Sequence, residues 1–143
     1  MKATIFYRIA TVLLLLFAVG HTIGFLTFVP PTPEGVAVWD AMNRVTFSVD
    51  GVAYSYGHFY RGLGLSVTVC LLFEAWLAWM LGAMTKRGVD VRPITAAFVL
   101  LHAVGAVLAW MYVGMPPLVL SVLLVIAFSA AMLAERKQLA TAP

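Results

Sequence analysis

The sequence predicts an all-α, polytopic membrane protein, a four-helix bundle with a short cap between its first and second spans. Of its 143 residues, 63% are hydrophobic and only 10% are charged, whereas soluble domains carry about a quarter charged residues. Four stretches reach the roughly 20 apolar residues that a helix needs to cross a bilayer. Each is expected to be helical, because backbone groups in lipid must be hydrogen-bonded within their own segment. The composition therefore excludes a soluble enzyme and a disordered region.

The four predicted spans differ in polar content. The second carries one formal charge, Glu74, and the third carries one histidine, His102. The first follows Lys2 and Arg8, as a secretory signal would. Its apolar run is too long for a signal core, so we expect it to be retained. The predicted spans are residues 9–28, 62–84, 93–113 and 115–134, with a cap at 29–61, all in one domain of residues 1–143.

Basic residues are divided unequally between the two sides of the predicted membrane. An even number of spans places both termini on one side, together with the turn at 85–92. Only Arg44 and Arg61 lie on the other side. Because positive residues concentrate in cytoplasmic loops, we expect both termini to be cytoplasmic and the cap to face outward. The basic residues expected on the cytoplasmic side are Lys2, Arg8, Lys86, Arg87, Arg92, Arg136 and Lys137.

The cap begins with the signals of a helix start. Thr32 supplies a capping hydroxyl, Pro33 fits the first helical turn, and an acid follows near the positive end of the helix dipole. Asp40 and Arg44 stand four residues apart, the spacing at which opposite charges pair on a helix. We predict a short helix that lies on the membrane surface.

A hairpin is predicted after this helix. The runs 46–49 and 52–55 are rich in β-prone residues, and Asp50-Gly51 between them is a typical two-residue turn. The chain then re-enters the membrane through a group of aromatic residues that we expect to form an interfacial belt. These are Tyr54, Tyr56, Phe59 and Tyr60.

Glu74 and His102 are the candidates for a catalytic or proton-handling site inside the membrane. Ionisable side chains cost free energy there and normally face protein or water. Every fourth residue from His58 through Glu74 to Gly82 is small or polar, which turns Glu74 toward the bundle and leaves Leu71 off this face. Both candidates lie about 14–15 Å from the cytoplasmic end of their spans. Because the turn between these spans is short, we expect the two side chains to meet.

Two interpretations of this pair remain open. In the first, the carboxyl and the imidazole form a structural polar clasp that fixes the register of two helices. In the second, they handle a proton or contact a ligand. The residue types are compatible with both interpretations, since a carboxyl and an imidazole are also the commonest general acids and bases.

A second group of candidates lies at the outer mouth of the predicted bundle. Arg44 and Arg61 are expected to hold a phosphate or carboxylate head group through forked hydrogen bonds; the alternative is ordinary snorkelling to the interface. Gly20 and Gly24 form a G-x-x-x-G match, expected to bring a neighbouring helix close to His21. The candidate ligand-binding residues are His21, Asn43, Arg44, His58, Tyr60 and Arg61.

No recognised catalytic motif is present, so we expect a binding function. The chain would bind a lipid-like or small amphipathic molecule, or act as an accessory subunit of a larger membrane complex. Membrane lipid, a membrane-protein partner or a second copy are the expected partners, and the net charge of +3 reflects topology rather than nucleic-acid binding. Cys70 is the only cysteine, which excludes an internal disulfide and a four-thiolate metal site.

Two alternative functions belong to other classes. An intramembrane enzyme would use Glu74 and His102 for acid–base chemistry on a lipid or isoprenoid substrate. A haem-b electron carrier would use His21 and His102 as axial ligands, with neighbouring glycines making room for the porphyrin.

Four motifs resemble a set of small bacterial four-span membrane proteins that have no assigned function. They are GHTIGF at 20–25, PPTP at 30–33, MNRV at 42–45 and FYRGLG at 59–64. The resemblance implies a protein of the bacterial inner membrane and transfers no activity. The architecture is also loosely similar to DoxX-like and sterol-isomerase-like four-helix membrane bundles. The residue patterns of those two families are not matched, so none of their sites is carried over.

Overall fold

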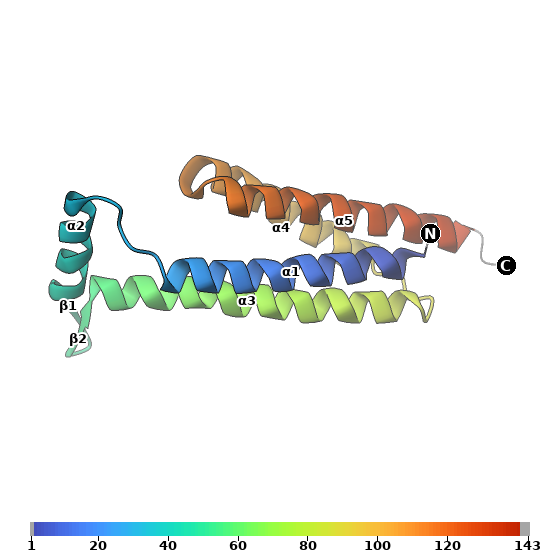
Figure 1. Ribbon diagram of the computed structural model, residues 1–143. Coiled ribbons are helices and arrows are strands. Elements are labelled where there is room, and N and C mark those ends of the chain that lie inside the picture. The colour runs from blue at the N-terminus through green and yellow to red at the C-terminus, as the bar shows by residue number, and fades with distance from the viewer. Residues whose placement is uncertain (1, 141–143) are drawn as a thin grey trace. The chain divides into compact units, whose positions relative to one another are not determined.

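The computed structural model describes residues 2–140, with side chains through residue 138, and divides them into two compact units. The terminal unit contains residues 2–17 and 71–140, and the central unit contains residues 18–70. Figure 1 shows two long helices, α1 (Ala3–Leu26) and α3 (Tyr56–Thr85). Each of them contributes residues to both units.

The predicted all-α class with four membrane-length helices is confirmed. Besides α1 and α3, these helices are α4 (Arg92–Leu108), which ends in the π-helical turn η1 (Ala109–Val113), and α5 (Met115–Ala140). α1 and α3 begin several residues before the predicted spans, and α5 continues past residue 134. The predicted boundaries followed the apolar runs, whereas helical hydrogen bonding continues through the flanking polar residues. The helices therefore include charged residues that the predicted spans left outside.

The core of the terminal unit lies among four helices: α1 up to residue 17, α3 from residue 71, α4 and α5. Aromatic rings fill its centre: Phe98 of α4 stacks on Phe128 of α5 at 4.8 Å, and Tyr7 of α1 meets Phe128 edge-on at 6.4 Å. Small residues on α3 allow the other helices to approach closely. The buried apolar residues include Tyr7, Leu14, Leu71, Ala75, Ala78, Leu81, Phe98, Ala109, Leu124, Phe128 and Ala131.

The small-residue face predicted for α3 is wrong in part. Gly62, Ser66 and Cys70 are exposed, whereas Leu71, which the prediction placed off this face, is buried. The reason is geometric: steps of four residues advance about 40° beyond a full turn, so a strict four-residue stripe winds around the helix. The prediction holds nearer the C-terminal end of α3, where Ala78 is fully buried.

The central unit contains the short helix and the hairpin that the sequence predicts. α2 (Pro33–Arg44) begins as expected, with the Thr32 hydroxyl accepting a hydrogen bond from the Gly35 N–H at 3.1 Å. The strands β1 (Thr46–Val49) and β2 (Val52–Ser55) pair antiparallel.

The turn of this hairpin is formed by Asp50-Gly51, as the sequence predicts. Asp50 and Gly51 have φ angles of 51° and 81°. Positive φ at both central positions is the type I′ geometry that matches the twist of a hairpin. At the other end of β2, the Ser55 hydroxyl accepts the His58 N–H at 3.1 Å and caps α3.

Candidate functional site

Glu74 and His102 meet in the terminal unit, as the sequence predicts. The Oε2 atom of Glu74 on α3 lies 3.4 Å from the Nε2 atom of His102 on α4. The His102 side chain is 6% exposed and that of Glu74 is 17% exposed. The carboxyl and the imidazole are thus close enough to attract each other in surroundings with little water.

Aromatic packing fixes the orientation of the imidazole. The His102 ring stacks on Phe128 of α5, with ring centres 5.8 Å apart and planes 6° from parallel. Phe98, one helical turn earlier on α4, adds a second stacked contact at 6.4 Å. Ser121 of α5 approaches Gly105, where an added Cβ would lie 3.7 Å from its hydroxyl oxygen, so α5 packs closely on this face of α4. The imidazole is held by neighbours on two helices.

The facing atoms of this pair retain unused hydrogen-bonding capacity. Both Glu74 Oε2 and His102 Nε2 are buried, and neither has a hydrogen bond among the described residues. Nearly all buried polar atoms in proteins have such a partner, and leaving one unsatisfied costs about 1–3 kcal/mol. The pair therefore places a buried carboxyl oxygen and a buried imidazole nitrogen side by side, each with unused hydrogen-bonding capacity.

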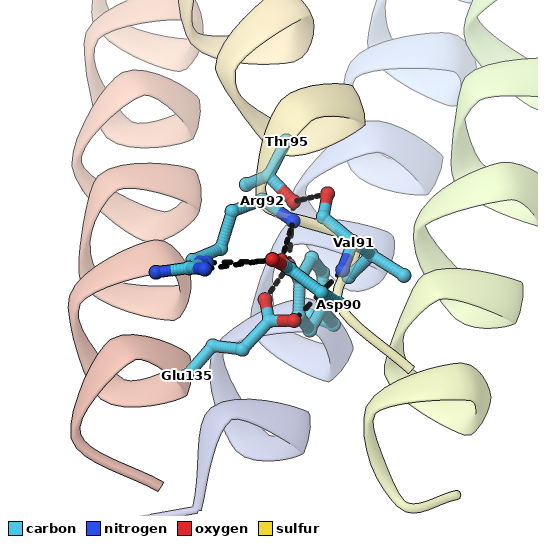
Figure 2. Close-up of polar contacts among 6 residues, drawn as sticks. Asp90, Val91, Arg92, Thr95 and Glu135 are labelled. Atoms are coloured by element: carbon cyan, nitrogen blue, oxygen red, sulfur yellow. Dashed lines mark hydrogen bonds and ion pairs between the residues drawn. The ribbon is translucent and has the colours of Figure 1, made fainter. Parts of the chain in front are cut away.

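A second buried acid, Glu135 of α5, was not among the predicted site residues. It is 2% exposed, and Figure 2 shows its side chain reaching toward the start of α4. Its Oε1 accepts the Val91 N–H at 2.8 Å, and its Oε2 accepts the Tyr7 hydroxyl at 3.3 Å. The Tyr7 oxygen also lies 2.5 Å from the Thr95 hydroxyl. Both oxygens of Glu135 are thus bonded, and the residue ties α1, α4 and α5 together.

A signal for Glu135 was present in the sequence. Leu124, Phe128, Ala131 and Glu135 follow one another at steps of four, three and four residues, the spacing of one helix face. The predicted span ended at residue 134 because apolar content ended there. Extending the helix by one turn would have placed Glu135 on the buried face of α5.

An exposed ion pair lies beside this buried cluster, between α3 and α4. Arg92 donates from Nε to Asp90 Oδ1 at 2.9 Å and from Nη2 to Asp90 Oδ2 at 2.7 Å (Figure 2). These hydrogen bonds lower the pKa of the Asp90 carboxyl from its ordinary value of 3.8 to about 2. The geometry is the forked arginine–carboxylate contact.

Within the central unit, the structure joins two of the outer-mouth residues. Arg61 of α3 donates to the Asn43 side-chain oxygen of α2 at 2.9 Å, while the Asn43 amide donates to the Trp39 carbonyl at 2.8 Å. Tyr60 packs edge-on against Trp39 at 5.9 Å. Arg61, Asn43 and Tyr60 therefore hold α2 against the start of α3.

The other outer-mouth residues have separate surroundings. His21 donates from Nε2 to the Gly64 carbonyl at 2.9 Å. The His58 side chain is exposed. Arg44 lines a shallow surface pocket of about 420 Å³ with Ala37, Asp40 and Asn43. Among the described residues, Asp40 and Arg44 form no ion pair, although their spacing on the helix allows one. Both residues are exposed, where such pairs contribute little.

The G-x-x-x-G match does not bring helices together as expected. An added Cβ at Gly20 or Gly24 would meet nothing within 4 Å. The close approach occurs at Gly64 of α3, where an added Cβ would overlap the ring of Phe25. This ring lies parallel to that of His21 at 5.8 Å. A glycine motif marks close packing only when it faces the neighbouring helix.

Haem ligation by His21 and His102 stays a prediction. The two residues belong to different units, and His21 would have to give up its bond to the Gly64 carbonyl to bind iron through Nε2. Within the described residues, no three or more His, Cys, Asp and Glu side chains cluster so that they would hold a metal ion.

Comparison with known proteins adds no relative. No protein-family model, curated protein or solved structure matches the chain.

Proposed function

We propose that this four-span integral membrane protein binds a small amphipathic molecule whose polar group is held by Glu74 and His102. The observation that carries the proposal is the pair itself: two buried polar atoms 3.4 Å apart, neither of them hydrogen-bonded. A ligand hydroxyl would complete the site by donating to the carboxylate and accepting from the imidazole N–H. Its apolar part would be accommodated by the surrounding lipid and apolar side chains.

The contrast with Glu135 supports a ligand role over a structural clasp. A clasp is most stabilising when its polar atoms are fully bonded, as both oxygens of Glu135 are. Glu74 instead faces its partner without a hydrogen bond. Buried polar groups left unsatisfied in a native structure often mark functional sites.

The test is to identify by mass spectrometry the lipids, small molecules and proteins that co-purify with the wild type and with the variants Glu74→Gln, His102→Ala and Glu135→Gln. Loss of one charge-assisted hydrogen bond predicts that Glu74→Gln retains about ten-fold less of the bound molecule. Glu135→Gln is the matched control, since it removes a buried charge in the same unit without touching the proposed site. Equal retention by Glu74→Gln and His102→Ala would leave the pair a structural clasp, and a co-purifying protein lost from neither variant would favour the accessory-subunit role.

An intramembrane acid–base enzyme is the second candidate, favoured by the direct approach of a carboxyl to an imidazole. Such an enzyme would shift a double bond by adding a proton to one carbon and removing a proton from another, with no change in oxidation state. Incubation with host lipid extract in D₂O would then place deuterium in the product. Wild type is expected to incorporate it and Glu74→Gln is not; the absence of incorporation by wild type would exclude this chemistry for the lipids tested.

A further inference from the structure

The terminal unit carries a second candidate site that is separate from Glu74 and His102. A groove of about 600 Å³ opens between the start of α4 and the last turns of α5. This volume lies in the range of pockets that hold small ligands. Its lining residues are Asp90, Arg92, Pro93, Met132, Leu133 and Arg136.

The groove lies where two membrane-length helices end. Arg92 is the first residue of α4, and Arg136 lies four residues before the end of α5 at Ala140. Lipid phosphates lie at this level of a bilayer, just outside the hydrocarbon. Met132 and Leu133 lie about one turn deeper on α5. The groove is therefore polar at the height of a phosphate and apolar at the height where acyl chains begin.

The charges of the lining are unequal. Asp90 has both carboxylate oxygens occupied by Arg92, and Glu135 beside the groove points inward to Val91 and Tyr7. Among the described residues, Arg136 forms no ion pair with an acid. Two arginines and one aspartate give the lining a formal charge of +1.

We propose that this groove binds one anionic phospholipid, with Arg136 bonded to its phosphate and its first acyl methylenes against Met132 and Leu133. The forked bond to Asp90 holds the Arg92 guanidinium in place and leaves its Nη1 donors for the same phosphate. Basic pockets between membrane helices recognise anionic head groups by this combination of cation and apolar wall.

The test compares retention of phosphatidylglycerol and phosphatidylcholine by native mass spectrometry after exchange of the purified protein into mixed nanodiscs. Wild type is expected to retain phosphatidylglycerol preferentially, and Arg136→Gln to retain about five-fold less of it. Arg87→Gln is the matched control: it removes one positive charge from the turn after α3 but does not line the groove. Arg136→Lys should restore part of the retention.

Three outcomes would overturn the proposal. Equal loss in Arg87→Gln and Arg136→Gln would show general attraction to a charged surface. Equal retention of phosphatidylglycerol and phosphatidylcholine would show that the groove does not distinguish lipids by the charge of their head groups. An equal rise in thermal stability with inorganic phosphate and with phosphatidylglycerol would assign the groove to a free anion. The Glu74→Gln variant leaves this groove intact. If that variant still retains the molecule proposed to bind at Glu74 and His102, the proposed function is refuted, and the proposal for the groove is unaffected.

Discussion

Glu74 and Glu135 are acids on buried faces of the same unit, yet their surroundings differ. Glu135 accepts one backbone N–H and one tyrosine hydroxyl, so both of its oxygens are bonded. Among the described residues, Glu74 Oε2 has no hydrogen bond, and it lies 3.4 Å from the imidazole Nε2 of His102. The first acid joins three helices, and the second retains capacity for a further polar group. Burial alone would not have distinguished their roles.

The ion pair of Asp90 and Arg92 predicts a measurable titration. Because hydrogen bonds from Arg92 lower the Asp90 pKa to about 2 in the folded protein, the pair contributes fully above about pH 4 and is lost as the pH falls toward 2. In a carboxyl ¹³C NMR titration, the Asp90 midpoint should lie near 2 in wild type and near 4 in Arg92→Gln. Arg87→Gln should leave the midpoint unchanged; a wild-type midpoint near 4 would contradict the assignment.

The close contact of α1 and α3 in the central unit depends on one glycine. An added Cβ at Gly64 would overlap the Phe25 ring, whereas one at Gly62 would meet nothing within 4 Å. Gly64→Ala would force Phe25 away from His21 and Tyr60, with which its ring packs. We expect it to lower the free energy of unfolding by about 1–3 kcal/mol.

Gly62→Ala is the control for this comparison. It adds the same methyl group to the same helix without a clash, and alanine is the better helix former, so its stability should match or exceed that of wild type. Denaturant or thermal unfolding in detergent would measure both variants. Equal stabilities would show that α1 and α3 do not pack closely at Gly64.

At the level of elements, the features that were predicted correctly from the sequence are those controlled by interactions between residues close together in the chain. The cap of α2 at Thr32 and the Asp50-Gly51 turn follow from interactions within a few residues. The faces of the long helices were harder to predict, because in an apolar helix nearly every position is hydrophobic and periodicity carries little contrast. The approach of Glu74 to His102 was predictable from depth and a short turn. Glu135 was missed because the predicted span ended one residue before it, and its partners Tyr7 and Val91 lie far from it in sequence.

For the whole molecule, the uneven division of basic residues predicts the membrane orientation. All seven residues expected on the cytoplasmic side belong to the terminal unit, and Arg44 and Arg61 belong to the central unit. In a Cys70→Ala background, an impermeant maleimide should label Asp50→Cys in intact cells and Arg87→Cys only after the cells are opened. The reverse pattern would invert the topology, and labelling of both in intact cells would contradict it.

The charge distribution also separates the two proposed sites. The lipid site proposed in the groove beside Arg136 depends on a cation near the end of a span, so its occupancy is expected to vary with lipid charge. The Glu74–His102 pair lies within the spans and depends on hydrogen bonding. Exchange of anionic for zwitterionic lipid should therefore empty the first site and leave the second occupied.

The most direct test of the central claim is the infrared absorption of the Glu74 carboxyl group, recorded before and after bound amphipathic molecules are removed by delipidation. The band is assigned by its absence from Glu74→Gln. If a ligand hydroxyl is hydrogen-bonded between Glu74 and His102, delipidation should shift the band, and restoring the extracted molecules should reverse the shift. A band that keeps its position throughout would contradict the proposal that this pair holds a ligand.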